Sequence, residues 1–125
     1  MYWFFLIDFA IILLFFQVLS TASDPHLGGR DFDLLLANHF AEDFKTRYKV
    51  DAKTKPRAFV RLLGECEKLK KLMSANTQAI PINIECFMDD KDVSGRMARD
   101  EMENMAKGFF DRAEVVMRTC MENAG

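Results

Sequence analysis

Apolar positions recur with two different periods along this chain. In three stretches they fall every three or four residues, which places them on one face of a helix. In a shorter stretch they alternate with polar residues, which is typical of a strand exposed on one side. The pattern predicts, in order, a short strand (17–22), two helices (31–48 and 56–76), a strand pair (79–88 and 93–97) and a last helix (99–122).

Each predicted helix carries its own apolar stripe. The stripes are Phe32, Leu35, Leu36, His39 and Phe40 in the first helix, Phe59, Leu62, Cys66, Leu69 and Met73 in the second, and Met102, Met105, Phe109, Ala113, Val116 and Cys120 in the last. His39 is expected in the core or at its boundary. The first strand alternates through Ile80, Ile82, Ile84 and Cys86, and Pro81 places it at a sheet edge.

The chain begins with an apolar head that differs from everything after it. Residues 2–16 are apolar apart from Asp8, and a Lys or Arg first occurs at position 30. Three interpretations stay open. The head is a transmembrane anchor over residues 2–19, although such a span prefers about 20 apolar residues and a carboxylate is costly in lipid. It is a signal peptide without its basic start. Or it is a gene-model artefact, because residues 13–17 spell the translation of an intron end. The expected organisation is residues 1–16 as this head and residues 17–125 as one partial domain.

Composition narrows the function classes. The 125 residues suffice for one domain. The net charge is −2, from 17 basic and 19 acidic residues, which argues against a nucleic-acid binder. The three cysteines are odd in number and form no CxxC motif, which suggests neither a disulfide framework nor a zinc site and favours reduced thiols in the cytoplasm. A membrane or secretory location is the alternative if the apolar head is genuine.

One face of the second helix carries candidate chemistry. Its members are Glu67, Lys70, Lys71 and Ser74, at positions i, i+3, i+4 and i+7. A carboxylate can accept hydrogen bonds from ribose hydroxyls, lysine stems can cover an aromatic base, and a hydroxyl can donate and accept. On spacing alone, an exposed face with weak ion pairs is the simpler interpretation.

Other motifs point less clearly to a site. Gly28 and Gly29 precede a helix, where anions often bind, but they match no phosphate-loop motif, and a turn with positive φ is the simpler interpretation. We predict no catalytic residues and no metal ligands in this chain.

Three segments resemble a known family. They are LGGRDFD (27–33) with NHF (38–40), RLLGECEKLKKLMSAN (61–76) and INIECFMDDKDVSGRM (82–97). They are similar to the nucleotide-binding domain of the 70-kDa heat-shock chaperone superfamily. Within it, the residues of the second and third segments resemble the large, 110-kDa branch most. The resemblance covers residues 17–122 and is looser in the last helix.

The resemblance implies an α+β chain that is part of an actin-like ATPase fold. The chain would supply the upper subdomain of the second lobe, with two helices, antiparallel strands and a C-terminal helix. By motif, Glu67, Lys70, Lys71 and Ser74 would contact the adenosine of ATP or ADP, and Gly28 and Gly29 would belong to the same site. Lys71 replaces an arginine common in the superfamily, which weakens stacking on the base because a planar guanidinium stacks better.

The same resemblance indicates what this chain lacks. The first lobe, both phosphate hairpins, the catalytic lysine, the carboxylates that position magnesium and a GGATRIP-like loop are not among these 125 residues. We therefore expect weak or absent nucleotide binding and no ATP hydrolysis by this chain alone. The intact relatives would exchange nucleotide on 70-kDa chaperones and hold unfolded polypeptides.

Two alternatives stay open beside that function. The first is a non-enzymatic chaperone-interaction module without nucleotide binding, tethered to a membrane by residues 2–19. The second is a chain too marginally stable to persist, because a lobe cut from a larger sheet leaves open edges and apolar faces.

Overall fold

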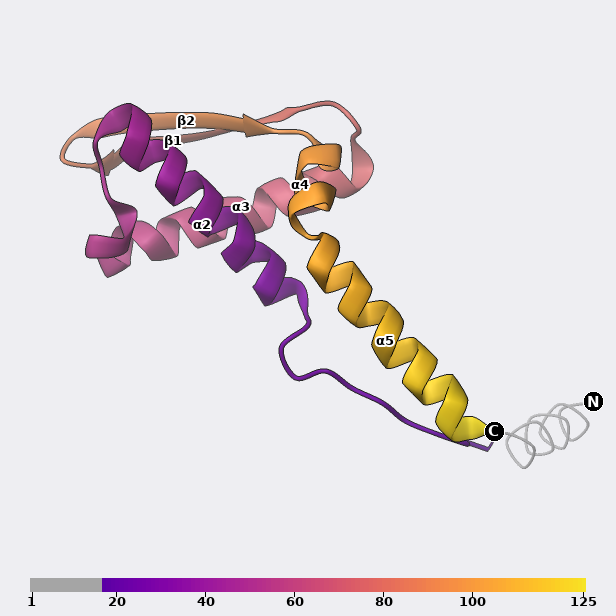
Figure 1. The fold of residues 1–125 in the computed structure, drawn as a ribbon. Helices are drawn as coiled ribbons and strands as arrows, with labels where there is room; N and C mark the ends of the chain where they lie inside the picture. Colours follow the sequence, from indigo (N-terminus) through magenta and orange to yellow (C-terminus); the bar gives the residue numbers. More distant parts are fainter. Residues whose placement is uncertain (1–16) are drawn as a thin grey trace, which may run out of the picture.

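A computed structural model describes residues 17–125 as helices packed against a hairpin, with one long helix extending away (Figure 1). The hypotheses for residues 1–16 lie outside the described residues. The elements are α2 (Gly29–Tyr48), η1 (Ala52–Thr54), α3 (Pro56–Ala75), β1 (Ile80–Met88), β2 (Lys91–Met97), α4 (Arg99–Met105) and α5 (Lys107–Ala124). Mixed helices and an antiparallel strand pair agree with the predicted fold class. No helix of this described part is long and apolar enough to span a membrane.

Local chemistry fixes where α2 and α3 begin and end. The Asp31 carboxylate accepts a hydrogen bond from the Gly28 amide at 2.9 Å, which satisfies a donor at the start of α2. Lys49 ends that helix in the left-handed region, with φ of 59°. Pro56 is the first residue of α3, where its missing N–H removes no helical hydrogen bond. Both helices were expected within two residues of these bounds.

The hairpin and two helices enclose the core. Ile82 and Ile84 of β1 and Val93 and Met97 of β2 point inward, and Gly95 lies on the same face. The alternate residues Asn83, Ser94 and Arg96 are exposed. The helices α2 and α3 cover the inward face and contribute the largest fully buried side chains. From the helices these are Phe40, Phe44, Leu36, Leu62, Met73 and Cys66, and Met97, Val50 and Val93 complete the set. We call α2, η1, α3, β1 and β2 the core unit.

Gly95 lets α2 approach the hairpin closely. A Cβ at this position would lie 2.8 Å from a ring carbon of Phe40 and 3.3 Å from a methyl carbon of Ile82. Such contacts are too short for carbon atoms, so a side chain here would push the helix from the sheet. The glycine therefore permits the Phe40 ring to occupy the inward face of β2.

A bulge in β1 corrects the predicted alternation. Ile84 pairs with Val93 and Met88 with Lys91, so β1 holds two extra residues between these pairs. Cys86 has φ of 44° and is exposed, whereas Phe87 is buried. The expected inward Cys86 is therefore wrong, because the bulge turns Phe87 toward Phe44, with ring centroids 5.8 Å apart.

Side chains from both strands and helices satisfy the backbone groups of this bulge. Arg61 of α3 donates to the carbonyls of Glu85 and Cys86, each at 2.9 Å. The Asp92 carboxylate accepts from the Cys86 amide at 2.7 Å. The bulge therefore leaves few of its backbone groups without a hydrogen-bond partner.

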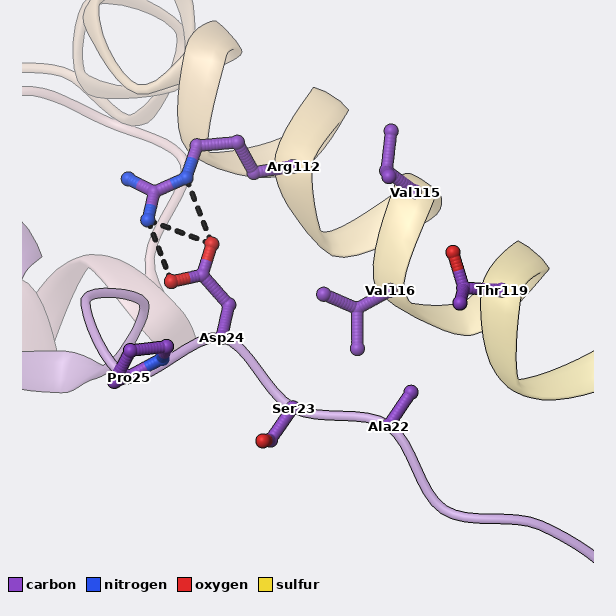
Figure 2. Close-up of a pocket in the computed structure, with 8 residues that line it drawn as sticks. All are labelled: Ala22, Ser23, Asp24, Pro25, Arg112, Val115, Val116 and Thr119. Carbon is purple, nitrogen blue, oxygen red and sulfur yellow. Dashed lines mark hydrogen bonds and ion pairs between the residues drawn. The ribbon is translucent and has the colours of Figure 1, made fainter.

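Residues 17–22 do not form the predicted strand. They run as an extended segment toward α5, because a strand needs a neighbour to receive its hydrogen bonds and this segment lies beside a helix. Figure 2 shows how the segment is held: Arg112 of α5 reaches the Asp24 carboxylate, with bonds of 2.9 and 2.7 Å. Ala22 and Val116 face each other beside this pair.

The predicted last helix is two helices. Ala106 leaves the helical conformation, with φ of −88° and ψ of 4°, and separates α4 from α5. The turn aims Phe109 and Phe110 at Phe32, with ring centroids 5.1 and 5.7 Å apart. Beyond this contact α5 extends away from the core unit (Figure 1). None of the residues in Lys107–Ala124 is buried by the described chain, so its predicted stripe is only partly covered.

His39 is also placed differently from the expectation. It is exposed on α2, and its ring lies edge-on to Phe40 with centroids 5.4 Å apart. The apolar stripe of α2 is rotated toward Leu36, Phe40 and Phe44, because these positions face both α3 and the hairpin. His39 lies beside that stripe rather than in it.

Candidate functional site

An exposed ion pair dominates the candidate face of α3. Lys71 donates to the Glu67 carboxylate at 2.7 Å, and both side chains are at least half exposed. This hydrogen bond lowers the pKa of Glu67 below its usual value and raises the pKa of Lys71. The carboxylate is therefore ionised at neutral pH, and its second oxygen can accept a hydrogen bond from a ligand.

Lys70 turns away from that pair toward α2. Its ammonium lies 2.6 Å from Asp33 Oδ1, a buried oxygen that it faces as an ion pair, and donates to the Gly29 carbonyl at 3.0 Å. The Lys70 and Asp33 side chains are 24% and 15% exposed. The structure thus brings Lys70 to Gly29 and separates it from the Glu67–Lys71 pair.

The two glycines do not adopt the expected positive φ. Gly28 is extended, with φ of −161°, and Gly29 is the first residue of α2. A Cβ on Gly29 would lie 3.2 Å from the Lys70 ammonium. The interpretation as a turn with positive φ is therefore wrong, and a side chain at position 29 would require the Lys70 ammonium to shift by a few tenths of an ångström.

Ser74 lies at the other end of the face, where α3 ends. Its hydroxyl donates to the Lys71 carbonyl at 2.6 Å, one turn earlier. Arg99, the first residue of α4, donates to the carbonyls of Met73 and Ser74. These carbonyls have no partner inside the helix, so Arg99 caps α3 and holds the segment that carries Ser74.

A groove of about 440 Å³ continues the face between α2 and α3. It is lined by Arg30, Asp33 and Leu34 of α2 and by Val60, Leu63, Gly64 and Glu67 of α3. Leu34 is 44% exposed and Val60 is 66% exposed. Glu67 therefore belongs both to the predicted face and to an apolar groove beside it.

This arrangement is suited to binding rather than to covalent chemistry. It offers a carboxylate, one exposed ammonium group and a hydroxyl along one helix, while the second ammonium, of Lys70, is engaged by Asp33. The nearby Cys66 thiol is buried in the core, and burial raises its pKa to about 12, so it is not a nucleophile.

Sequence reasoning missed two residues that support the face. Asp33 fixes Lys70, and Arg99 caps the helix end at Ser74. Near the start of α2, Asp33 has a simpler explanation from sequence, because a carboxylate there is favoured by the helix dipole. No sequence signal joined it to Lys70, because the two residues lie on different helices.

Comparison with known proteins supplies the family. A family model described as Hsp70 protein matches residues 11–125. The chain belongs to the Hsp70 family. It is 55% identical over 106 residues to the "97 kDa heat shock protein" of Strongylocentrotus purpuratus, which covers 85% of this chain and 12% of that protein.

Further relatives place the resemblance in the large branch of this family. The chain is 53% identical over 106 residues to the human "Heat shock 70 kDa protein 4", covering 85% of this chain and 13% of the relative. It is 52% identical over 101 residues to "Heat shock protein 110" of Caenorhabditis elegans, covering 81% and 13%. The predicted family is thus confirmed, and the chain spans about an eighth of the length of these Hsp70-family relatives.

Proposed function

We propose that this chain forms the adenosine-contacting wall of a nucleotide-binding domain in the large branch of the Hsp70 family. The observation that carries the proposal is the exposed face of α3, where Glu67, Lys71 and Ser74 follow one another in the order expected from the motif. Lys70 and Gly29, which the motif assigns to the same site, lie 3.0 Å apart.

The side chains suit the chemistry of a nucleoside. The ionised Glu67 carboxylate accepts hydrogen bonds from ribose hydroxyls, and the Lys71 stem covers one face of the adenine. The Ser74 hydroxyl can exchange its bond to the Lys71 carbonyl for one to a ring nitrogen. A single wall buries little of a ligand, so the expected affinity for adenosine is millimolar or weaker.

The proposal extends to the longer relatives as a class. In a complete domain this wall would close on ATP or ADP through rotation of two lobes. The protein would act in the cytoplasm on 70-kDa chaperones, exchanging their nucleotide, and on unfolded polypeptides. The three free cysteines, Cys66, Cys86 and Cys120, support a reducing compartment.

Titration of the 125-residue chain with adenosine and ADP tests the adenosine wall. Backbone amide signals of Glu67, Lys71 and Ser74 should shift with millimolar midpoints in an NMR experiment. Adenosine and ADP should bind within about threefold of each other, because the phosphate hairpins are not part of this chain. Guanosine should bind more weakly.

A matched pair of variants controls this titration. Glu67→Gln should abolish the shifts, whereas Glu114→Gln should preserve them, although Glu114 also pairs with a basic residue four positions later. Micromolar binding of ADP, or shifts confined to residues outside α3, would contradict the adenosine wall.

Exposed apolar side chains on α5, which lie outside its predicted stripe, favour a second candidate function. Val115, Met117 and Met121 are each more than 60% exposed on this helix, and exposed apolar groups of this kind are typical of interaction surfaces. The alternative is a chaperone-interaction module without nucleotide binding. Calorimetric titration with a purified 70-kDa chaperone distinguishes the two: micromolar binding that Met117→Glu abolishes, with no adenosine shifts, favours the alternative.

A further inference from the structure

The candidate face of α3 is longer than an adenosine site requires. Val60, Gly64, Glu67, Lys71 and Ser74 are spaced by four, three, four and three residues, so they form one stripe along the helix. The last three members are the predicted adenosine contacts. The first two line the groove between α2 and α3, and Glu67 is shared by both parts.

Gly64 belongs to this stripe and has open space where a side chain would be. It lies in the middle of α3, where a glycine costs about 1 kcal/mol relative to alanine. Among the described residues, nothing lies within 4 Å of the place where its Cβ would be. Packing inside the described chain therefore does not require a glycine here, and its effect is to keep the floor of the groove open.

The groove has the size and character of a small-molecule site. Its 440 Å³ lies within the range of roughly 300–1,000 Å³ common for ligand pockets. Leu34, Val60 and Leu63 give it apolar walls, while Arg30 and Glu67 provide charges at its borders. A ligand that donates a hydrogen bond to Glu67 can therefore place an attached apolar group in this groove.

We propose that this groove binds an apolar group carried on a ribose hydroxyl of adenosine. The inference rests on the proposed function, because Glu67 is taken there as the acceptor for those hydroxyls. With adenine toward Ser74 and ribose at Glu67, a substituent on the 2′ or 3′ oxygen points along the stripe to Gly64. The ligand class is therefore a 2′- or 3′-O-acyl adenosine with an aromatic or aliphatic acyl group.

A fluorescent ligand of this class tests the inference. The probe is 2′/3′-O-(N-methylanthraniloyl) adenosine, titrated into the 125-residue chain beside unsubstituted adenosine. The labelled compound should bind about tenfold more tightly, the gain expected from burying on the order of 60 Å² of apolar surface. Its fluorescence should rise on binding, since the fluorophore leaves water.

Two glycine variants make the test specific. Gly64→Leu fills the groove without disturbing the helix, and should return the labelled compound to the affinity of adenosine. Gly108→Leu is the matched control, since Gly108 of α5 also has open space around it, and should keep the tenfold gain. Val60→Asp, at an exposed groove position, should remove the gain in the same way as Gly64→Leu.

The outcomes separate this inference from the proposed function. If adenosine shifts Glu67, Lys71 and Ser74 but the label adds no affinity, the groove proposal fails alone. It also fails if the gain survives Gly64→Leu, or if methyl N-methylanthranilate, which carries no adenosine, binds as tightly as the labelled compound. If neither nucleoside binds, the adenosine wall fails and the groove proposal with it.

Discussion

The helices α3 and α5 carry apolar stripes of the same period but are buried to very different degrees. In α3 the stripe includes Leu62, Cys66, Leu69 and Met73, each no more than 2% exposed. In Lys107–Ala124 no side chain is buried by the described residues. We call α5 together with residues 17–28 the arm. The comparison teaches that periodicity identifies a face, whereas burial depends on which elements the fold brings to it.

The two regions also differ in what holds them. The core unit is held by interlocking side chains from two helices and a hairpin. The arm is held by the Phe32 contact and by the Asp24–Arg112 pair, beside an open pocket that Ala22 and Val116 line. We therefore expect the arm to open locally while the core unit stays folded.

Replacing a methionine in each region tests this difference between the core unit and the arm, with the largest expected change in stability. Met73→Ala removes a fully buried side chain of α3, and should lower the free energy of unfolding by about 2–5 kcal/mol. Met117→Ala in α5, where the side chain is 61% exposed, should change it by less than about 0.5 kcal/mol. Urea unfolding followed by circular dichroism measures both, and equal losses would show that the arm and the core unit unfold as one.

Gly95 tests how closely the core unit is packed. Gly95→Ala places a methyl group 2.8 Å from the Phe40 ring, and should destabilise the protein by about 1–3 kcal/mol. A second change, Phe40→Leu, should recover part of this loss by making room beside β2. Additive losses in the double variant would mean that the two positions do not touch.

Two helical glycines with open space around them test for a gain in stability rather than a loss. Gly64→Ala in the core unit should raise the free energy of unfolding by about 1 kcal/mol, because alanine is a better helix former and its Cβ enters open space. Gly108→Ala in the arm should instead slow hydrogen exchange in α5 and leave global unfolding nearly unchanged. A destabilising Gly64→Ala would reveal a contact at this site that the fold does not contain.

The smallest expected effect is the acid sensitivity of the arm. Hydrogen bonds from the His26 amide and from Arg112 lower the pKa of Asp24 below 3.8. A carboxyl whose folded pKa is depressed stabilises the fold above its unfolded pKa, and this contribution is lost as pH falls through the folded pKa. As pH falls below the usual aspartate range and through the lower pKa of the folded Asp24, residues 17–28 should therefore detach progressively from α5 while the core unit stays intact.

NMR signals of Ala22 and Val116 measure this detachment. Arg112→Met should detach the segment at neutral pH as well, and should remove the pH dependence. If the segment stays in place at a pH at which the Asp24 carboxyl is protonated, other contacts hold it.

Much of the core unit could be predicted from the sequence. The bounds of α2 and α3 follow from Pro56, from the acidic first turn of α2 and from the 3.6-residue period. The hairpin follows from alternation and from the polar turn, where Asp89 and Asp90 both have φ of 55°. These features depend on neighbours within a few residues, which the sequence itself contains.

The candidate face was predicted in its positions but not in its contacts. Helical geometry places Glu67, Lys71 and Ser74 on one side, and the structure keeps them there. Helical geometry alone could not reveal that Lys70 turns to Asp33, because that ion pair depends on how α2 and α3 pack.

The sequence by itself determined the family, the order of the elements from α2 to β2 and the side of α3 that carries polar groups. Tertiary structure alone decided that Phe87 rather than Cys86 enters the core, that the last helix breaks at Ala106 and that α5 stays incompletely covered. The physical reason is that these outcomes depend on atoms distant in sequence. A bulge needs Arg61 and Asp92 to satisfy its backbone, and an apolar stripe is buried only where another element packs against it.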